Sequence, residues 1–336
     1  MDQENVSAIV LIGGGTRMLK HVQSDSDYRK KTSTRELLSQ DLRRNPNIYL
    51  MLIPVVIFYT VFCYVPMFGL TIAFKDFSPR KGIWGSEWVG LKHFINFFEG
   101  PYAPQLIRNT VLLSLYSLIF GFPMPILLAF MIDEVRNKLF RRTMQTISYL
   151  PHFISIVVIV GIVKEFVSRD GLINWLILQF NSSYSPENLL NSARNFRPIY
   201  VISGIWQQVG WDSIIYLATL AGVDPQLYEA ITIDGGNRFH RIWNVSLPSI
   251  MPTIIILFIM RMGTIMNVGF EKVFLLYSEA NYDTSDVIST YVYRRGLINN
   301  EFSFASAVGL FNSVINLITG WFLTIQTSPP VFTIRC

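Results

Sequence analysis

The chain has 336 residues, of which 51% are hydrophobic and only 15% are charged. Soluble domains usually carry about a quarter charged residues, so this deficit and the long apolar blocks exclude an ordinary soluble protein and indicate a membrane protein. The net charge of +5 does not indicate nucleic-acid binding, because the basic residues cluster beside the apolar blocks, where membrane topology explains them.

The sequence offers little for metal binding or catalysis. Cys63 lies inside an apolar block and Cys336 is the last residue, so no disulfide framework is expected. No CxxC, His/Cys cluster, HExxH motif or Ser/His/Asp order is present. We therefore expect no catalytic residues, no metal and no cofactor bound by the chain itself.

Residues 1–47 form a polar, basic segment ahead of the first apolar block. Its short apolar run, Val6 to Ile12, cannot span a membrane, which needs about 20 apolar residues. Lys and Arg outnumber Asp and Glu in the rest of the segment. Basic residues beside a first span favour the cytoplasmic side, so we expect a cytoplasmic N-terminus.

The rest of the chain predicts an all-α polytopic membrane protein. Blocks of about 20 to 27 apolar residues are long enough to cross about 30 Å of hydrocarbon. The predicted transmembrane domain covers residues 48–326, followed by a short tail, 327–336, on the cytoplasmic side. The six predicted spans lie near residues 48–74, 107–132, 147–167, 198–222, 250–270 and 304–326.

The loops between these blocks agree with the predicted orientation on the inner side. The inner loop 133–146 contains four basic residues, and the inner loop 223–249 contains Arg238 and Arg241. The three outer loops are about 30 residues each, mixed in charge, and rich in Trp, Tyr, Asn and Ser. They are suited to receiving a partner or a ligand from outside.

Polar residues in the last two spans are candidates for a substrate path. An arginine far from both ends of a span costs at least ~2.5 kcal/mol in lipid, so it must face protein or water. It either lines a path, pairs with an acid, or serves a structural partner in a neighbouring helix. The amides could bind hydroxyl groups of a sugar or hold helices together. These candidates are Arg261, Asn267, Glu271, Asn312 and Asn316.

The inner loop 223–249 reads as two short helices with a break between them. Asp224 is a good N-cap and Pro225 fits the first helical position. Gly235 and Gly236 end the first helix, because glycine adopts the left-handed conformation at a helix C-terminus. A second helix begins near Asn237. Such a segment suits docking into a groove of another protein, an interfacial helix on lipid, or a plain connection.

The same loop resembles the EAA loop of binding-protein-dependent ABC importer permeases. The resemblance rests on Glu229-Ala230, Asp234-Gly235 and Leu247-Pro248, which stand at the spacing of that motif. The family usually has Ala at positions 231 and 236, where this chain has Ile231 and Gly236. In this family the loop is a cytoplasmic coupling helix held in a cleft of the ATPase subunit. The resemblance thus implies that Glu229, Ala230, Asp234, Gly235, Leu247 and Pro248 couple ATP hydrolysis to transport.

Other stretches look like the carbohydrate branch of these permeases, in the group named after a lipoprotein-linked polysaccharide permease. The resemblance implies the type I importer permease fold, a bacterial cell-membrane location and a carbohydrate substrate. It also implies a second permease subunit, an ABC ATPase dimer that uses ATP and Mg, and an extracellular solute-binding lipoprotein. The stretches are residues 49–77, 121–137, 268–277 and 290–297.

The ends of the chain depart from this family, whose members usually begin near the first basic cluster and end in a basic tail. We expect residues 1–30 to be an extension and the end, WFLTIQTSPPVFTIRC, to be truncated or altered. Three other functions stay open on the residues alone: import of a peptide or another polar solute, a polytopic membrane enzyme, and a sensor without transport.

Overall fold

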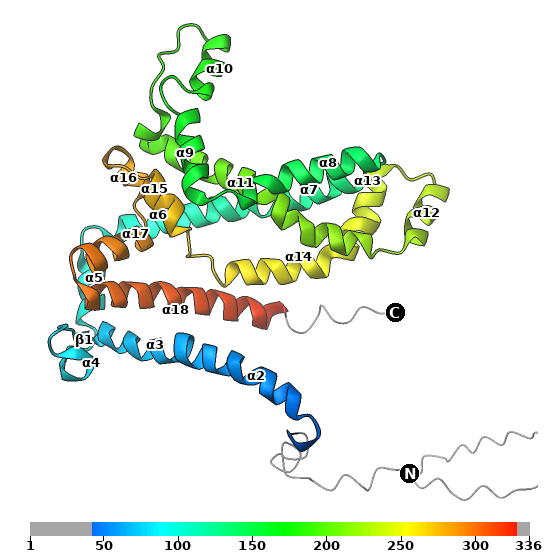
Figure 1. Ribbon diagram of the computed structural model, residues 1–336. Coiled ribbons are helices and arrows are strands. Elements are labelled where there is room, and N and C mark those ends of the chain that lie inside the picture. Colours follow the sequence, from blue (N-terminus) through cyan, green and yellow to red (C-terminus); the bar gives the residue numbers. More distant parts are fainter. Residues whose placement is uncertain (1–41, 328–336) are drawn as a thin grey trace, which may run out of the picture. The chain divides into compact units, whose positions relative to one another are not determined.

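The computed structural model describes residues 42–327, most of them helical (Figure 1). Residues 1–41 and 328–336, which hold most of the predicted N-terminal segment and of the tail, lie outside the described residues. The chain divides after Pro66 into two compact units.

The first unit contains helix α2 (Pro46–Tyr59) and the π-helical turn η1 (Thr60–Tyr64). Pro46 occupies a first-turn position, where its missing N–H leaves no hydrogen bond unmade. The sequence from Ile48 to Gly69 contains no charged residue, and an apolar surface all round a helix is what lipid requires.

The second unit contains the remaining elements, which are mostly helices joined by short turns. Two-residue strands, β1 and β2, form its antiparallel pair, with Lys75 opposite Trp88 and Asp76 opposite Glu87. The elements after α3 (Val65–Met67) are η2 (Phe68–Phe74), β1 (Lys75–Asp76), α4 (Gly82–Gly85), β2 (Glu87–Trp88), α5 (Lys92–Glu99), α6 (Ala103–Tyr116), η3 (Ser117–Gly121), α7 (Pro123–Asp133), α8 (Lys138–Tyr149), η4 (Leu150–Phe153), α9 (Ile156–Phe166), α10 (Leu172–Phe180), η5 (Leu189–Asn191), α11 (Ala193–Ala221), α12 (Pro225–Ile233), α13 (Arg238–Arg241), η6 (Ile242–Ser246), α14 (Leu247–Met262), α15 (Phe270–Leu276), η7 (Glu279–Asn281), α16 (Tyr282–Ser285), α17 (Ile288–Tyr293), η8 (Arg294–Ile298) and α18 (Phe302–Thr327).

Four helical runs among the described residues are long and apolar enough to cross a membrane. A fifth candidate, Lys138–Phe153 with Ile156–Phe166, is bent by 102° at the break between its two helices. The structure therefore supports four or five spans, and the number six stays a prediction. The four straight runs are Pro46–Phe74, Ala103–Asp133, Arg238–Met262 and Phe302–Ile325.

Two predicted spans differ from the structure in shape. The third, 147–167, is not one straight helix, because Pro151 lies in the first turn of the short 3-10 helix η4 and Ser155 caps a new helix, α9. The fifth, 250–270, is helical only to Met262 and continues in turns and irregular backbone to α15. Proline and capping residues explain the first difference. The hydropathy of residues 263–269 did not predict the second difference, the end of the helix at Met262.

Helix α11 lies at the centre of the second unit. It is 29 residues long and packs against α6, α7, α8, α9, α14 and α15. A Cβ atom at Gly210 would collide with the backbone of Ser148, so glycine is what lets α11 approach α8 this closely. The predicted fourth span, 198–222, lies within α11 except for its last residue, Gly222, but this helix is less apolar than the other candidates. A helix buried among other helices need not be as apolar as one facing lipid.

Candidate functional site

The predicted helix–break–helix between α11 and α14 is present. The Asp224 side chain accepts a hydrogen bond from the Gln226 N–H at 2.9 Å, and Pro225 begins α12. At the other end of α12, the Gly236 N–H donates to the Ile231 carbonyl at 2.8 Å. Gly235 has a φ of +75°, which glycine adopts without strain. This pattern is a Schellman motif, and it fixes the angle at which the chain leaves α12.

The second helix of this loop is not an isolated knob. Asn237 caps α13, and the helix continues through the π-helical turn η6 into α14, giving one run from Arg238 to Met262. Pro248 therefore lies inside this run, near the start of α14, rather than at the beginning of a separate span. The break between Ile233 and Arg238 is thus the interruption between α12 and the fifth predicted span.

The residues predicted for coupling lie mostly on the surface of this segment. Glu229, Ala230, Asp234 and Gly235 are exposed, Pro248 is exposed and Leu247 is half-buried. Several apolar side chains around them are also exposed, with Ile233 at 86% and Phe239 at 81%. The coupling segment, as residues 224–248 are called here, thus presents apolar and acidic groups that no other described residue covers.

An ion pair connects the coupling segment to the C-terminal end of α7. Arg241 Nη2 donates to both carboxylate oxygens of Glu134, at 2.7 and 3.0 Å. The Tyr228 and Ser246 hydroxyls also share a hydrogen bond of 3.0 Å, which connects α12 to η6. The Glu134 carboxylate is 20% exposed and paired, although no motif in the sequence connects it with Arg241. Charge-assisted bonds of this kind are stronger than neutral ones.

The five candidates for a substrate path fall into two groups. Asn267 Oδ1 accepts hydrogen bonds from Asn312 Nδ2 at 3.3 Å and Asn316 Nδ2 at 3.1 Å. Asn316 Oδ1 in turn accepts from the Met266 N–H at 2.9 Å. These bonds hold the irregular backbone after α14 against α18. The three amides thus connect neighbouring segments, which is one of the two roles considered for them from the sequence. Arg261 and Glu271 are exposed, and neither forms an ion pair within residues 42–327.

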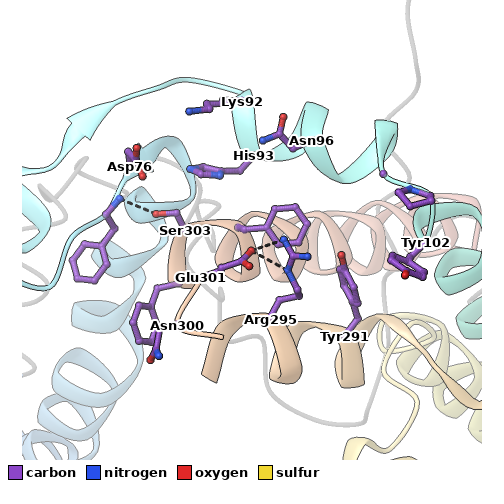
Figure 2. Close-up of a pocket in the computed structure, with 15 residues that line it drawn as sticks. Asp76, Lys92, His93, Asn96, Tyr102, Tyr291, Arg295, Asn300, Glu301 and Ser303 are labelled. Atoms are coloured by element: carbon purple, nitrogen blue, oxygen red, sulfur yellow. Dashed lines mark hydrogen bonds and ion pairs between the residues drawn. The ribbon is translucent and has the colours of Figure 1, made fainter. Parts of the chain in front are cut away.

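A pocket of about 560 Å³ lies between the first and third predicted outer loops (Figure 2). One wall comes from β1 and α5, with Asp76, Lys92 and Asn96. The opposite wall comes from η8 and the start of α18, with Arg295 and Glu301. The sequence indicated only that these loops could receive a ligand, because their residues are about 200 positions apart and no motif connects them.

The centre of the pocket is an ion pair held over aromatic rings. Arg295 donates from Nε at 2.9 Å and from Nη2 at 2.5 Å, both to Glu301 Oε2. The guanidinium lies 4.8 Å from the ring centroid of Phe304 and 5.8 Å from that of Tyr291. Burial raises the pKa of Tyr291 above its ordinary value. Figure 2 places Tyr102 beside Tyr291 at one end of the pocket.

A buried polar network fixes the loop that carries this pocket. Asn109 on α6 donates to the Asp283 and Asp286 carbonyls, both at 3.0 Å, and accepts from Arg197 on α11 at 2.9 Å. Asp286 pairs with Arg294 at 2.6 Å. Burial disfavours the charge of Arg294, but the hydrogen bonds and charge of Asp286 outweigh it and raise the pKa of this arginine. Sequence reasoning missed this network, whose members show no recognisable spacing.

Two aromatic side chains of α11, Trp211 and Tyr216, contact other protein groups. Trp211 stacks on His152 at 4.3 Å between ring centroids, and His152 Nδ1 lies 2.8 Å from Gln208 Oε1. Tyr216 is buried in the core. Lys272 was not predicted as a special residue, but it is buried and donates to the Tyr200 carbonyl at 2.9 Å.

Comparison with known proteins decides the family. Residues 121–328 match the family described as "Binding-protein-dependent transport system inner membrane component". The chain belongs to this family. It is therefore a multi-pass plasma-membrane transport subunit rather than an enzyme.

The chain resembles several individual members along most of its length. Protein LplB of Bacillus subtilis (strain 168) is 43% identical over 278 residues, covering 82% of this chain and 87% of that protein. The polygalacturonan/rhamnogalacturonan transport system permease protein YteP of the same organism is 43% identical over 295 residues, covering 88% and 91%.

The fold also matches a solved transporter subunit. A chain in the crystal structure of a bacterial ABC transporter involved in the import of the acidic polysaccharide alginate superposes with a TM-score of 0.79 at 43% identity. The match covers 87% of this chain and 98% of that one. The predicted all-α importer permease fold is thus confirmed, apart from the number of spans.

Proposed function

We propose that this chain is the permease through which an ATP-driven importer moves a sugar or oligosaccharide, delivered by an extracellular solute-binding protein. The exposed coupling segment carries this proposal, because a surface of apolar and acidic groups beside a rigid break is suited to docking on a partner. The names of YteP and of the alginate importer support a carbohydrate substrate.

The proposed assembly contains a second permease, an ABC ATPase dimer and an extracellular solute-binding lipoprotein. ATP and Mg act on the ATPase subunits, and this chain binds neither. Closure of the ATPase dimer moves the coupling segment as a rigid body, and the Glu134–Arg241 pair passes that movement to α7. The N-terminus is cytoplasmic, which places the coupling segment on the side where ATP is available.

The coupling role is tested by two substitutions and their matched controls. Glu229→Lys reverses an exposed charge, and Gly235→Pro forces a φ near −65° where the chain needs +75°. We expect both variants to insert into the membrane and to abolish solute uptake. The controls are Glu187→Lys, an exposed charge reversal in a predicted outer loop, and Gly235→Asn, because Asn tolerates the left-handed conformation. Both controls should keep uptake.

Uptake is measured in cells or proteoliposomes that contain the complete importer, and the amount of chain in the membrane is measured beside it. Normal uptake by Glu229→Lys or Gly235→Pro would remove the coupling role. A panel of neutral oligosaccharides, uronate oligosaccharides and peptides identifies the solute class. Uptake of peptides alone would refute the carbohydrate proposal and leave the coupling role standing.

A further inference from the structure

The pocket between the first and third predicted outer loops has no role in the coupling mechanism. It is formed within the second unit, so all its walls belong to one compact body. Its volume of about 560 Å³ lies in the range of small-molecule sites. Its walls combine aromatic rings with planar polar side chains, and this combination restricts the kind of ligand that fits.

The Arg295–Glu301 pair leaves one donor group and one acceptor unused. Both hydrogen bonds of the pair end on Glu301 Oε2, so Oε1 accepts from no side chain or backbone donor in the described part of the chain. Arg295 Nη1 likewise has no protein acceptor among residues 42–327. A hydroxyl group both donates and accepts, so the unused donor and the unused acceptor of this pair can each bind one.

Aromatic surface lies next to this pair. The rings of Tyr102 and Tyr291 have centroids 6.3 Å apart, and the Tyr102 side chain is 57% exposed. The C–H face of a sugar ring is apolar, so it gains from contact with such a surface while its hydroxyl groups bond to polar neighbours. Asn96 on the facing wall adds an amide that both donates and accepts.

The charges of the pocket cancel. Asp76 and Glu301 carry two negative charges, and Lys92 and Arg295 carry two positive charges. A balanced site gives no long-range attraction to an anion or a cation, so short-range contacts decide which ligand it binds. It suits a hydroxyl-rich ligand that is recognised by hydrogen bonds and ring contact.

We propose that this pocket is a sugar-binding subsite at the outer mouth of the permease, which holds one or two rings of the carbohydrate as it leaves the solute-binding protein. This inference rests on the proposed function and deepens it. The Arg295–Glu301 pair binds ring hydroxyl groups, Tyr102 contacts the ring face, and Asn96 binds a hydroxyl from the opposite wall.

The test uses the purified importer complex in lipid nanodiscs without its solute-binding protein. The probes are maltotriose, xylotriose and trigalacturonate, and the one that the complete importer takes up is chosen. Saturation-transfer NMR measures its binding to the complex and shows which ring protons lie against the protein. We expect saturable binding with the strongest transfer at one end of the oligosaccharide.

Two double variants decide whether the pocket is the site. Tyr102→Ala with Asn96→Ala removes an aromatic face and an amide, and we expect binding to weaken about tenfold or more, the combined effect of two lost contacts. The matched control is Trp84→Ala with Asn299→Ala, which changes an exposed aromatic residue and an exposed amide that do not line the pocket. The control should bind as the unmodified complex does.

The outcomes separate this subsite from the proposed function. If a probe is taken up, and the unmodified complex and the pocket variant bind it equally well, the subsite is overturned. The proposed function then stays intact. Uptake without any binding in the nanodisc would overturn it as well, in favour of a surface that contacts the solute-binding protein. A complex that takes up none of the three probes would refute carbohydrate import on this panel, and the subsite with it.

Discussion

At the residue scale, the departures of this chain from the family pattern at positions 231 and 236 are physically connected. A Cβ atom at Gly236 would collide with the Cγ2 methyl of Ile231 and lie 2.9 Å from the Ile231 carbonyl oxygen. The side chain and the backbone carbonyl of Ile231 therefore both favour glycine at position 236. The sequence alone does not show this connection, because residues 231 and 236 come close to each other only when the Schellman motif forms.

We predict that Gly236→Ala lowers the stability of the chain by about 1–3 kcal/mol, the usual cost of overpacking. Ile231→Ala in the same chain should recover part of this loss, because it removes the Cγ2 methyl. Thermal unfolding of the four combinations in one detergent measures the coupling between the two positions. Gly222→Ala is the control, since a Cβ there meets only the Thr219 carbonyl at 3.5 Å. Additive effects of the two substitutions would contradict the explanation.

At the element scale, the Glu134–Arg241 pair determines how the coupling segment is attached to the bundle. Two hydrogen bonds join the end of α7 to the helix after the break, between side chains that are 20% and 26% exposed. Hydrogen bonds to charged groups contribute about 1.5–3 kcal/mol, and this pair is buried enough to keep part of that value. The neighbouring Asp133–Arg141 pair has one bond of 3.3 Å and is more exposed.

We predict that Glu134→Ala destabilises the chain more than Asp133→Ala and reduces uptake further. A double-mutant cycle with Arg241→Ala measures the interaction directly, using unfolding midpoints and transport rates. A favourable coupling energy between positions 134 and 241 is the expected result. Independent effects of the two substitutions, with transport unchanged in Glu134→Ala, would show that the ion pair transmits no movement.

The sequence predicts some elements of this fold and misses others. Asp224, Pro225 and the two glycines predict α12 and its end, because local capping decides them. Hydropathy predicts the long apolar helices equally well. It misses the end of α14 at Met262 and the outer pocket, because both depend on contacts between segments far apart in the chain. The sequence left the role of Asn267, Asn312 and Asn316 open between sugar binding and helix packing, and their mutual hydrogen bonds appear only in the folded chain.

At the scale of the whole molecule, the chain is one subunit of a larger transporter complex. Its described surface includes many large apolar side chains, as expected of a protein that meets lipid and other subunits. The coupling segment and the outer pocket lie on opposite sides of the membrane in the predicted topology. An importer needs both, since solute enters on one side and ATP is used on the other.

The measurement that tests this account most directly is site-specific photocrosslinking in the native membrane. A benzophenone amino acid replaces Ile233, which is 86% exposed in the coupling segment, or Trp84, which is 90% exposed in a predicted outer loop. Mass spectrometry identifies the crosslinked proteins. The account predicts that position 233 crosslinks to a subunit with ATP-binding motifs and that position 84 does not. A crosslink to that ATPase from position 84, or none from position 233, would contradict it.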